Sequence, residues 1–191
     1  MNARLALVLL CVAGVAAGCA TRPETPASRE HLSAQVRETI ALFKVRDPGI
    51  ESFFERSYGY AVLPRITKGA VIVGGAYGKG EVFARGTKIG HCSMSQASVG
   101  FSFGGEYFRE IIFFREKGHL DLFRAGDFTF SGQVTAVALT RGAATKNDYQ
   151  DGMAVFVMAD AGLMVDASLA GQKFSFEPAF IMREEPPTIL P

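Results

Sequence analysis

From Tyr60 onward the chain changes from a helical to an extended pattern, and this change constrains the fold more than any other feature. Short runs rich in Val, Ile and Phe follow one another, each bounded by Gly, Pro or Asp, as is typical of β-strands. The predicted strand segments are YAVLP, GAVIVGGAY, GEVFARG, SVGFSFGGEYF, REIIFFR, DFTFSGQVTAVAL, MAVFVMAD and GLMVDASLAG. Because no long helices alternate with these runs, the pattern argues against a doubly wound parallel sheet.

We therefore expect an α+β protein with a predominantly antiparallel, strongly curved or barrel-like β-sheet, N-terminal helices and one short internal helix. The first helical segment, SREHLSAQVRETIALFKV, has Ser28 or Ser33 as its expected cap. Its apolar face is formed by Leu32, Val36, Ile40 and Phe43. Asp47-Pro48 is expected to open a short helix that carries Ile50, Phe53 and Phe54. The internal helix is expected in REKGHLDLFRAG, with Leu120 and Phe123 directed inward.

The first eighteen residues read as a secretory signal rather than as part of the fold. Arg4 precedes an apolar run from Leu5 to Ala17, which is short for a membrane-spanning helix. The sequence Ala16-Ala17-Gly18-Cys19 resembles the lipobox of bacterial lipoproteins. In such proteins the signal is cleaved before the cysteine, which becomes the N-terminal residue and is acylated, with palmitate among the usual acyl groups. An ordinary signal peptide or an uncleaved anchor are the alternatives. Ala20, rather than an aspartate, follows Cys19, which resembles lipoproteins sent to the outer membrane.

These features predict a signal peptide over residues 1–18, a tether over 19–27, a single domain over 28–185 and a tail over 186–191. The chain contains 20 basic and 19 acidic residues, and removal of the signal takes away one basic residue, so the mature net charge is zero. A nucleic-acid-binding protein normally carries a basic excess, so we expect no nucleic-acid partner. Cys92 would be the single free cysteine after processing, and no internal disulfide is expected.

The stretch VIVGGAYGKGEVFARG combines glycines with a lysine, as phosphate-binding loops do. It does not match a Walker loop, because Val73 stands where the first glycine belongs and Gly80 where a Ser or Thr would bind Mg²⁺. The glycine spacing also differs from the dinucleotide fingerprint. We expect no nucleotide and no cofactor. The stretch instead predicts a hairpin with strands Ala70–Ala76 and Glu81–Arg85 and a turn at 77–80.

Basic residues gather around this predicted hairpin, although the mature chain is neutral. Between Ala61 and Cys92 the sole acid is Glu81, so the local charge is positive. The candidate lipid-binding residues are Arg65, Lys68, Lys79, Arg85 and Lys88. A basic patch of this kind attracts anionic lipid headgroups, and a solvated rim of unrelated cations is the alternative.

The sequence contains no constellation of residues typical of an enzyme. Its histidines, His31, His91 and His119, are far apart, and no zinc-binding spacing occurs. His91 and Cys92 are neighbours, but adjacent residues on a strand point to opposite faces, so they do not form a nucleophile–base pair. We expect Cys92 to be a buried filler, no metal site and no catalytic activity.

The order of the segments resembles the SYLF lipid-binding domain family over about residues 30–180. The most specific features are KGA…GGAYGKG (Lys68–Gly80), the strand SVGFSFGG and the closing GLMVDASLAG. The SVGFSFGG strand alternates large and tiny residues, so another part of the chain or an acyl chain could lie close against its small face. Where the family has an aromatic Trp-Ser-x-Pro segment, this chain has His91-Cys92-Ser93-Met94. Phosphoinositide and actin binding by eukaryotic members are therefore not carried over.

The resemblance implies a non-catalytic phospholipid-binding domain, with Lys68, Lys79 and Arg85 matching the motif as possible headgroup contacts. Together with Cys19, this predicts a lipid-anchored protein of the cell envelope, expected in the outer membrane facing the periplasm. The alternative is an envelope scaffold, held to the membrane by acylated Cys19 alone, whose domain binds a protein partner.

Overall fold

The computed structural model describes residues 21–70, 73–99, 106–126, 128–129, 135–159 and 171–179. The described helices are α2 (Pro26–Arg46), the 3₁₀-helix η2 (Pro48–Ile50), α3 (Glu51–Arg56), α4 (Lys117–Arg124) and α5 (Ala143–Lys146). The described strands are β1 (Gly59–Ala70), β2 (Val73–Ala84), β3 (Thr87–Val99), β4 (Glu106–Phe114), β5 (Phe128–Thr129), β6 (Ala136–Ala138), β7 (Met153–Ala159) and β8 (Gln172–Pro178). No helix in these ranges is both long enough and apolar enough to cross a bilayer.

The strands form one sheet in the order β5-β8-β3-β2-β1-β4-β7-β6. All neighbouring strands are antiparallel except β6 and β7, which are parallel. The prediction of an α+β protein with a mainly antiparallel sheet is therefore confirmed. Strands β5 and β6 end the order, and no pairing in the described part of the chain joins them, so the sheet is not closed into a barrel.

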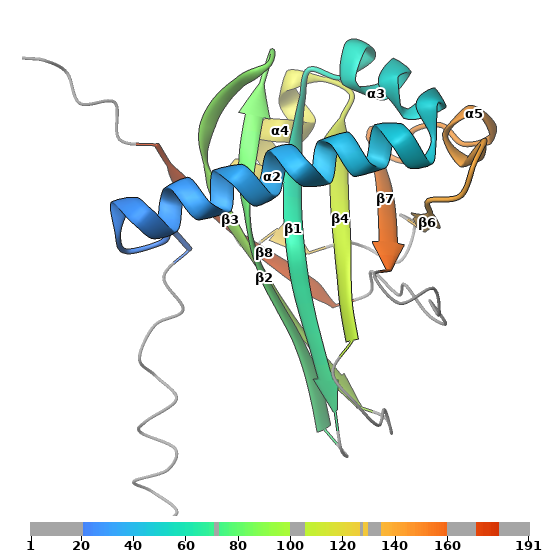
Figure 1. Ribbon diagram of the computed structural model, residues 1–191. Helices are drawn as coiled ribbons and strands as arrows, with labels where there is room; N and C mark the ends of the chain where they lie inside the picture. The colour runs from blue at the N-terminus through green and yellow to red at the C-terminus, as the bar shows by residue number, and fades with distance from the viewer. Residues whose placement is uncertain are drawn as a thin grey trace, which may run out of the picture.

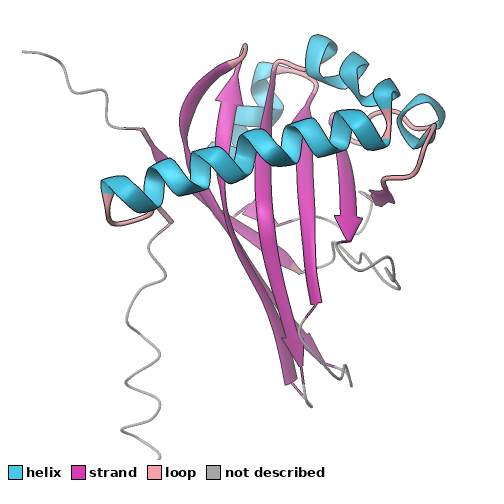
Figure 2. Ribbon diagram, viewed as in Figure 1, coloured by secondary structure: helices cyan, strands magenta, loops and turns pink. Residues whose placement is uncertain are grey.

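Both faces of the central strands are buried. Helix α2 crosses in front of the strands (Figures 1 and 2), and on this outer face Val36 and Phe43 pack with Val62 of β1. On the opposite, inner face, Leu120 and Phe123 of α4 pack with Leu63 of β1. Because successive side chains of a strand point to opposite faces, β1 supplies both hydrophobic clusters.

The helix predictions hold for most residues and fail at the start of α2. Leu32, Val36 and Phe43 are buried, and Ile40 packs partly buried against the same outer cluster. The N-cap, however, is Thr25, whose hydroxyl accepts from the Ser28 backbone N–H while the Ser28 hydroxyl accepts from the Thr25 N–H. The expected caps Ser28 and Ser33 are therefore wrong, because the reciprocal capping box is completed one turn earlier.

The structure places the start of the domain earlier than the sequence does. Helix α2 begins at Pro26, inside the expected tether of 19–27, and Pro23 is already buried. The described part of that segment, from Thr21, therefore belongs to the folded domain. Residues 1–18, Cys19, and the tail 186–191 lie outside the described residues.

The two short-helix predictions are confirmed and one helix was missed. Asp47 caps η2 by accepting from the Gly49 N–H at 3.1 Å, and α4 directs Leu120 and Phe123 into the inner cluster. A second short internal helix, α5, was not predicted. Its N-terminal backbone also binds Asp47, whose Oδ2 accepts from the Ala144 N–H at 2.7 Å.

The predicted hairpin turn at 77–80 is wrong. Strand β2 runs without interruption through these residues, and the turn lies at Arg85 and Gly86, whose φ values of 48° and 77° are left-handed. The neighbouring strand β1 is also longer than predicted, and its register with β2 shifts between Val62 and Arg65. A proline, Pro64, is tolerated inside this central strand because it sits in the bulge.

Two strands were missed and two predictions cannot be compared. Neither β3 over 87–97 nor β8 was predicted. Residues 87–97 are mostly polar, and β8 contains only two large apolar residues, Phe174 and Phe176. The strand SVGFSFGG retains only its first two residues in the described part of β3, without their side chains. The rest of that motif, and all of GLMVDASLAG except Gly171, lie outside the described residues.

Candidate anion-binding groove

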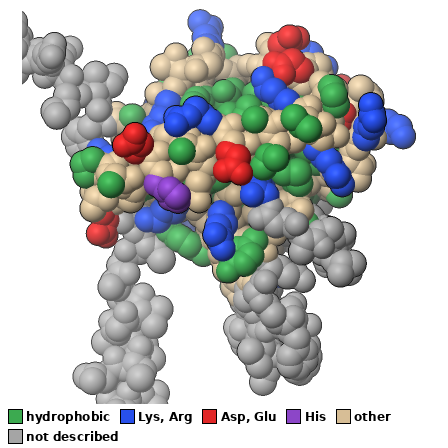
Figure 3. Space-filling model, in the orientation of Figure 1, with side chains coloured by type: hydrophobic (Ala, Val, Ile, Leu, Met, Phe, Trp, Pro, Cys, Tyr) green, Lys and Arg blue, Asp and Glu red, His purple; other side chains and the backbone are tan. Residues whose placement is uncertain are grey.

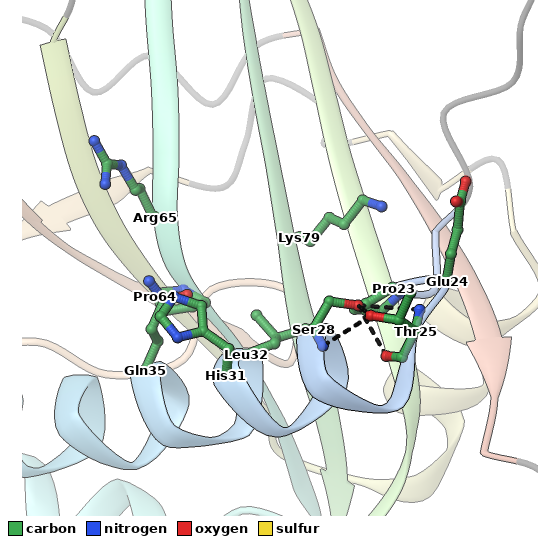
Figure 4. A pocket seen from close by; sticks show the side chains of 10 residues that line it. All are labelled: Pro23, Glu24, Thr25, Ser28, His31, Leu32, Gln35, Pro64, Arg65 and Lys79. Atoms are coloured by element: carbon green, nitrogen blue, oxygen red, sulfur yellow. Dashed lines mark hydrogen bonds between the residues drawn. The ribbon is translucent and has the colours of Figure 1, made fainter.

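A shallow groove of about 480 Å³ lies between the beginning of α2 and the outer face of β1 and β2 (Figure 4). It is lined by Pro23, Glu24, Thr25, Ser28, His31, Leu32, Gln35, Pro64, Arg65 and Lys79. In the space-filling view, a histidine and several Lys or Arg side chains lie beside one another along the edge of the long helix (Figure 3). The groove thus combines residues that the sequence separates by more than fifty positions.

Arg65 and Lys79 supply the positive charge of the groove from two adjacent strands. They are direct partners in the β1–β2 register, and directly opposite residues share one face of a sheet. Lys79 is half-buried and has no ion-pair partner among the described residues. The Arg65 guanidinium lies 4.0 Å from the centroid of the Tyr107 ring, a contact that leaves its charge uncompensated.

The wall opposite these cations comes from α2 and the segment before it. His31, Gln35 and Ser28 line this side and offer polar side chains (Figure 4). The first turn of α2 contains no acidic residue, so no carboxylate in that turn offsets the positive end of the helix dipole. Glu24 is the one carboxylate in the lining, so the groove keeps a positive balance.

Lys88 belongs to a different arrangement and is not free to bind a ligand. Its Nζ forms an ion pair with Oε1 of Glu81, and Glu81 is only 2% exposed. The Ser33 hydroxyl of α2 donates to the same carboxylate oxygen at 2.6 Å. Lys88 therefore neutralises a buried acid, and this structural role separates it from the cations of the groove.

The remaining two candidates do not reach the groove either. Lys68 is two residues after Ile66 on β1, so the two side chains point to the same face, and Ile66 belongs to the inner cluster. Lys68 is also in register with Ala76 of β2, which belongs to the same cluster. Lys68 therefore lies on the face opposite the groove. Arg85 is in the β2–β3 turn, with its guanidinium 5.2 Å from the Tyr58 ring centroid. Of five predicted cations, the structure brings only Arg65 and Lys79 together.

The outer face next to the groove contains a row of polar residues, of which Glu81 and His91 are buried, and the sequence analysis did not predict this burial. Glu81, His91 and Glu177 form one row, because His91 is in register with both acids on its two neighbouring strands. Burial, and then the nearby Lys88 charge, lower the pKa of His91. The alternation of Lys79, Glu81 and Phe83 along one face of β2 was the available signal for placing Glu81 beneath α2.

A second buried polar pair lies on the inner face. Glu110 of β4 is fully buried, and Gln172 of β8 donates from Nε2 to its Oε2 at 3.2 Å. Burial, partly opposed by this hydrogen bond, raises the pKa of Glu110 to about 7. Nothing in the local sequence REIIFFR distinguishes this buried carboxyl from a solvent-facing one.

His91 and Cys92 point to opposite faces, as their adjacency on a strand predicts. Cys92 is fully buried in the inner cluster, and burial raises the pKa of its thiol. It is therefore the buried filler that we expected. Among the described residues, no three His, Cys, Asp or Glu side chains are placed to hold a metal ion.

No family model matches the chain. Beta cell expansion factor A of Aeromonas veronii is 29% identical to it over 136 residues, which is 71% of this chain. The chain spans about half of that curated relative, 51% of its length. The name of the relative mentions neither a ligand nor a reaction.

Proposed function

We propose that this protein is a non-catalytic phospholipid-binding domain of the SYLF type, anchored in the cell envelope through acylated Cys19. The groove contacts the phosphate of an anionic headgroup through Arg65 and Lys79. The observation that carries this proposal is Lys79, a half-buried cation without an ion partner in the described structure, directly opposite Arg65 in a groove. A phosphate would offset the positive balance that Arg65 and Lys79 give the groove.

The expected affinity of the isolated domain is low. A Lys or Arg near an anionic membrane surface contributes about 1 kcal/mol, so two such residues give weak binding by themselves. An acyl anchor raises the effective concentration of headgroups around the domain. Weak headgroup recognition therefore suffices once the protein is lipid-anchored, and we place the protein at the periplasmic side of the outer membrane.

We also propose that the sheet is strongly curved, with its concave side toward α4. Strands β4 and β8 have β1, β2 and β3 between them, which in a flat sheet would separate them by about 19 Å. The hydrogen bond between Gln172 and Glu110, at 3.2 Å, supports curvature that brings the two strands toward each other. Phe123 of α4, which has ring contacts with both Phe114 and Phe174, supports the same arrangement.

The test is flotation of residues 20–191, which lack the acylated cysteine, with vesicles of increasing anionic lipid content. Binding should rise with anionic content and fall with salt. Neutralising each cation, Arg65→Gln or Lys79→Gln, should weaken binding about fivefold, the equivalent of about 1 kcal/mol. Lys68→Gln removes the same charge from the same sheet on the opposite face, so this matched control should bind like the parent.

Two outcomes would contradict the proposal in different ways. Equal losses for Lys68→Gln and Lys79→Gln would show general charge attraction without a groove. Absence of binding at low salt on every vesicle would leave Cys19 as the sole membrane attachment, as the scaffold alternative requires. The search would then turn to a protein partner.

A further inference from the structure

The segment that precedes α2 is fixed to the sheet rather than extended into solvent. The Thr21 hydroxyl lies 3.2 Å from that of Ser93 in β3. The backbone N–H of Arg22 donates to Oε2 of Glu177 in β8, also at 3.2 Å. The segment therefore lies against two neighbouring strands of the outer face.

The same segment is also held from the helix side. The Arg29 guanidinium donates through Nη1 to the carbonyl oxygens of Pro23 and Glu24, each at 3.1 Å. Pro23 is buried, and Thr25 completes the capping box of α2. With contacts to β3, β8 and α2, residues 21–25 form part of the folded domain.

The sequence leaves little chain between this fixed segment and the proposed anchor. Cys19 is two residues before Thr21, and an extended chain spans at most about 3.6 Å per residue. The chain between the proposed anchor and Thr21 can therefore span at most about 7 Å. Each headgroup layer of a bilayer is about 5–8 Å thick, so this length cannot lift the domain clear of the membrane surface.

We propose that the domain lies directly on the bilayer that holds its own anchor, with the start of α2 facing the phospholipid headgroups. This inference rests on the acylation of Cys19 in the proposed function. The occupant of the surface is the phospholipid headgroup layer of that same membrane. Pro23, Glu24 and Thr25 also line the groove, so the anchor brings the groove to the headgroups.

The opposite end of α2 is then held away from the membrane. From Ala27 to Val45 the helix advances about 27 Å at 1.5 Å per residue, and Figure 1 shows its far end beside α3 and α5. Both Ala27 and Val45 are exposed. The two positions are thus a membrane-proximal and a membrane-distal probe on one helix.

The chain contains no tryptophan, so single-tryptophan variants give an unambiguous fluorescence signal. Ala27→Trp and Val45→Trp are made in the full, lipidated protein and reconstituted into vesicles that contain lipids with a headgroup-linked quencher. Mass spectrometry first checks that Cys19 carries acyl chains. We expect at least threefold stronger quenching of the tryptophan at position 27 than of that at position 45.

A spacer variant tests whether the short connection causes this orientation. Ten Gly and Ser residues inserted between Ala20 and Thr21 add a flexible chain with a mean span of about 17 Å. Combined with Arg65→Gln and Lys79→Gln, the spacer should remove the difference between the two positions. Without the spacer, the same two substitutions should leave the difference in place.

The outcomes separate this inference from headgroup binding. Equal quenching at the two positions in the lipidated parent protein, or an unmodified Cys19, would overturn the orientation whatever the unanchored domain binds. The orientation would also be overturned if the tryptophans at positions 27 and 45 were still quenched to different extents in the spacer variant that carries both Arg65→Gln and Lys79→Gln. Conversely, the orientation is supported if the tryptophan at position 27 of the lipidated protein is the more strongly quenched, even when residues 20–191 bind no vesicle. That combination would contradict only the proposal that the groove binds headgroups.

Discussion

Gly80 of β2 lies beside Val62 of the neighbouring strand β1, so close that a Cβ atom on Gly80 would be 2.2 Å from the Val62 carbonyl oxygen. At Gly78, a Cβ would be 2.7 Å from Cγ1 of Ile66. These contacts flank the β1 bulge that contains Pro64. The glycines beside Lys79 therefore allow two backbones to approach closely, and the same bulge sets Arg65 opposite Lys79.

We predict that Gly80→Ala destabilises the protein by at least about 2 kcal/mol, because the added methyl group overlaps backbone atoms that cannot move independently. Gly118→Ala is the matched control. A Cβ at Gly118 in α4 meets nothing within 4 Å, so alanine should be neutral or stabilise by up to about 1 kcal/mol. Urea unfolding measures both, and a Gly80→Ala variant as stable as the parent would contradict this account of the glycines.

Lys88→Met is expected to destabilise the protein by about 3 kcal/mol, because it leaves the Glu81 carboxylate buried without its cation. The double variant Glu81→Gln/Lys88→Met removes both charges and should recover much of the loss. Lys117→Met breaks an exposed pair with Asp121 and should cost less than about 0.5 kcal/mol. If chemical denaturation gives additive losses for the Glu81 and Lys88 changes, the coupling between them is absent.

Glu110 gives the stability a defined pH dependence. Its pKa is raised from the ordinary 4.5 to about 7 by burial, with the Gln172 hydrogen bond opposing this rise. Between these values the native state keeps a proton that the unfolded chain loses. The contribution is therefore present below about pH 4.5 and is lost as pH rises through about 7, at a cost of about 3 kcal/mol.

Glu110→Gln should accordingly raise the free energy of unfolding at pH 8 by more than at pH 5, relative to the parent protein. Denaturant unfolding at the two pH values measures this difference. A shift of the same size at both pH values would mean that Glu110 does not titrate in this range. Glu116→Gln, on an exposed residue, serves as the control.

Asp47→Ala should lower the free energy of unfolding by about 3 kcal/mol, because the carboxylate accepts backbone hydrogen bonds from Gly49 and Ala144. Burial acts to raise the pKa of Asp47, but the backbone N–H groups of Ala144, Gly142, Gly49 and Ala143 outweigh it and hold the pKa below its usual range. The stabilisation is thus present above the unfolded pKa and is lost as pH falls through the folded pKa. Asp148→Ala, with a side chain that is 72% exposed, should have little effect on thermal unfolding.

Local pattern was sufficient for the elements whose apolar residues follow one clear period. The 3.6-residue spacing of Leu32, Val36 and Phe43 predicted the buried face of α2, and Asp47-Pro48 predicted the next helix start. The same reasoning failed for β3 and β8, because their positions in the sheet are filled by Ser, Gln and Gly residues as well as by apolar ones. It also misplaced the turn of the Gly-rich stretch, since glycine serves both turns and close strand contacts.

By itself, the sequence determined the fold class, the helix faces, the nearly balanced charge and the cluster of five candidate cations. Only the tertiary structure decided which of those cations share a site. Strand register and the bulge at Pro64 place Arg65 beside Lys79. The alternation of side chains along β1 places Lys68 on the other face, and Lys88 forms an ion pair with the buried Glu81. The Arg65–Lys79 pairing depends on the register between two strands, and the burial of Glu81 depends on α2 packing over β2. Local periodicity contains no information about either.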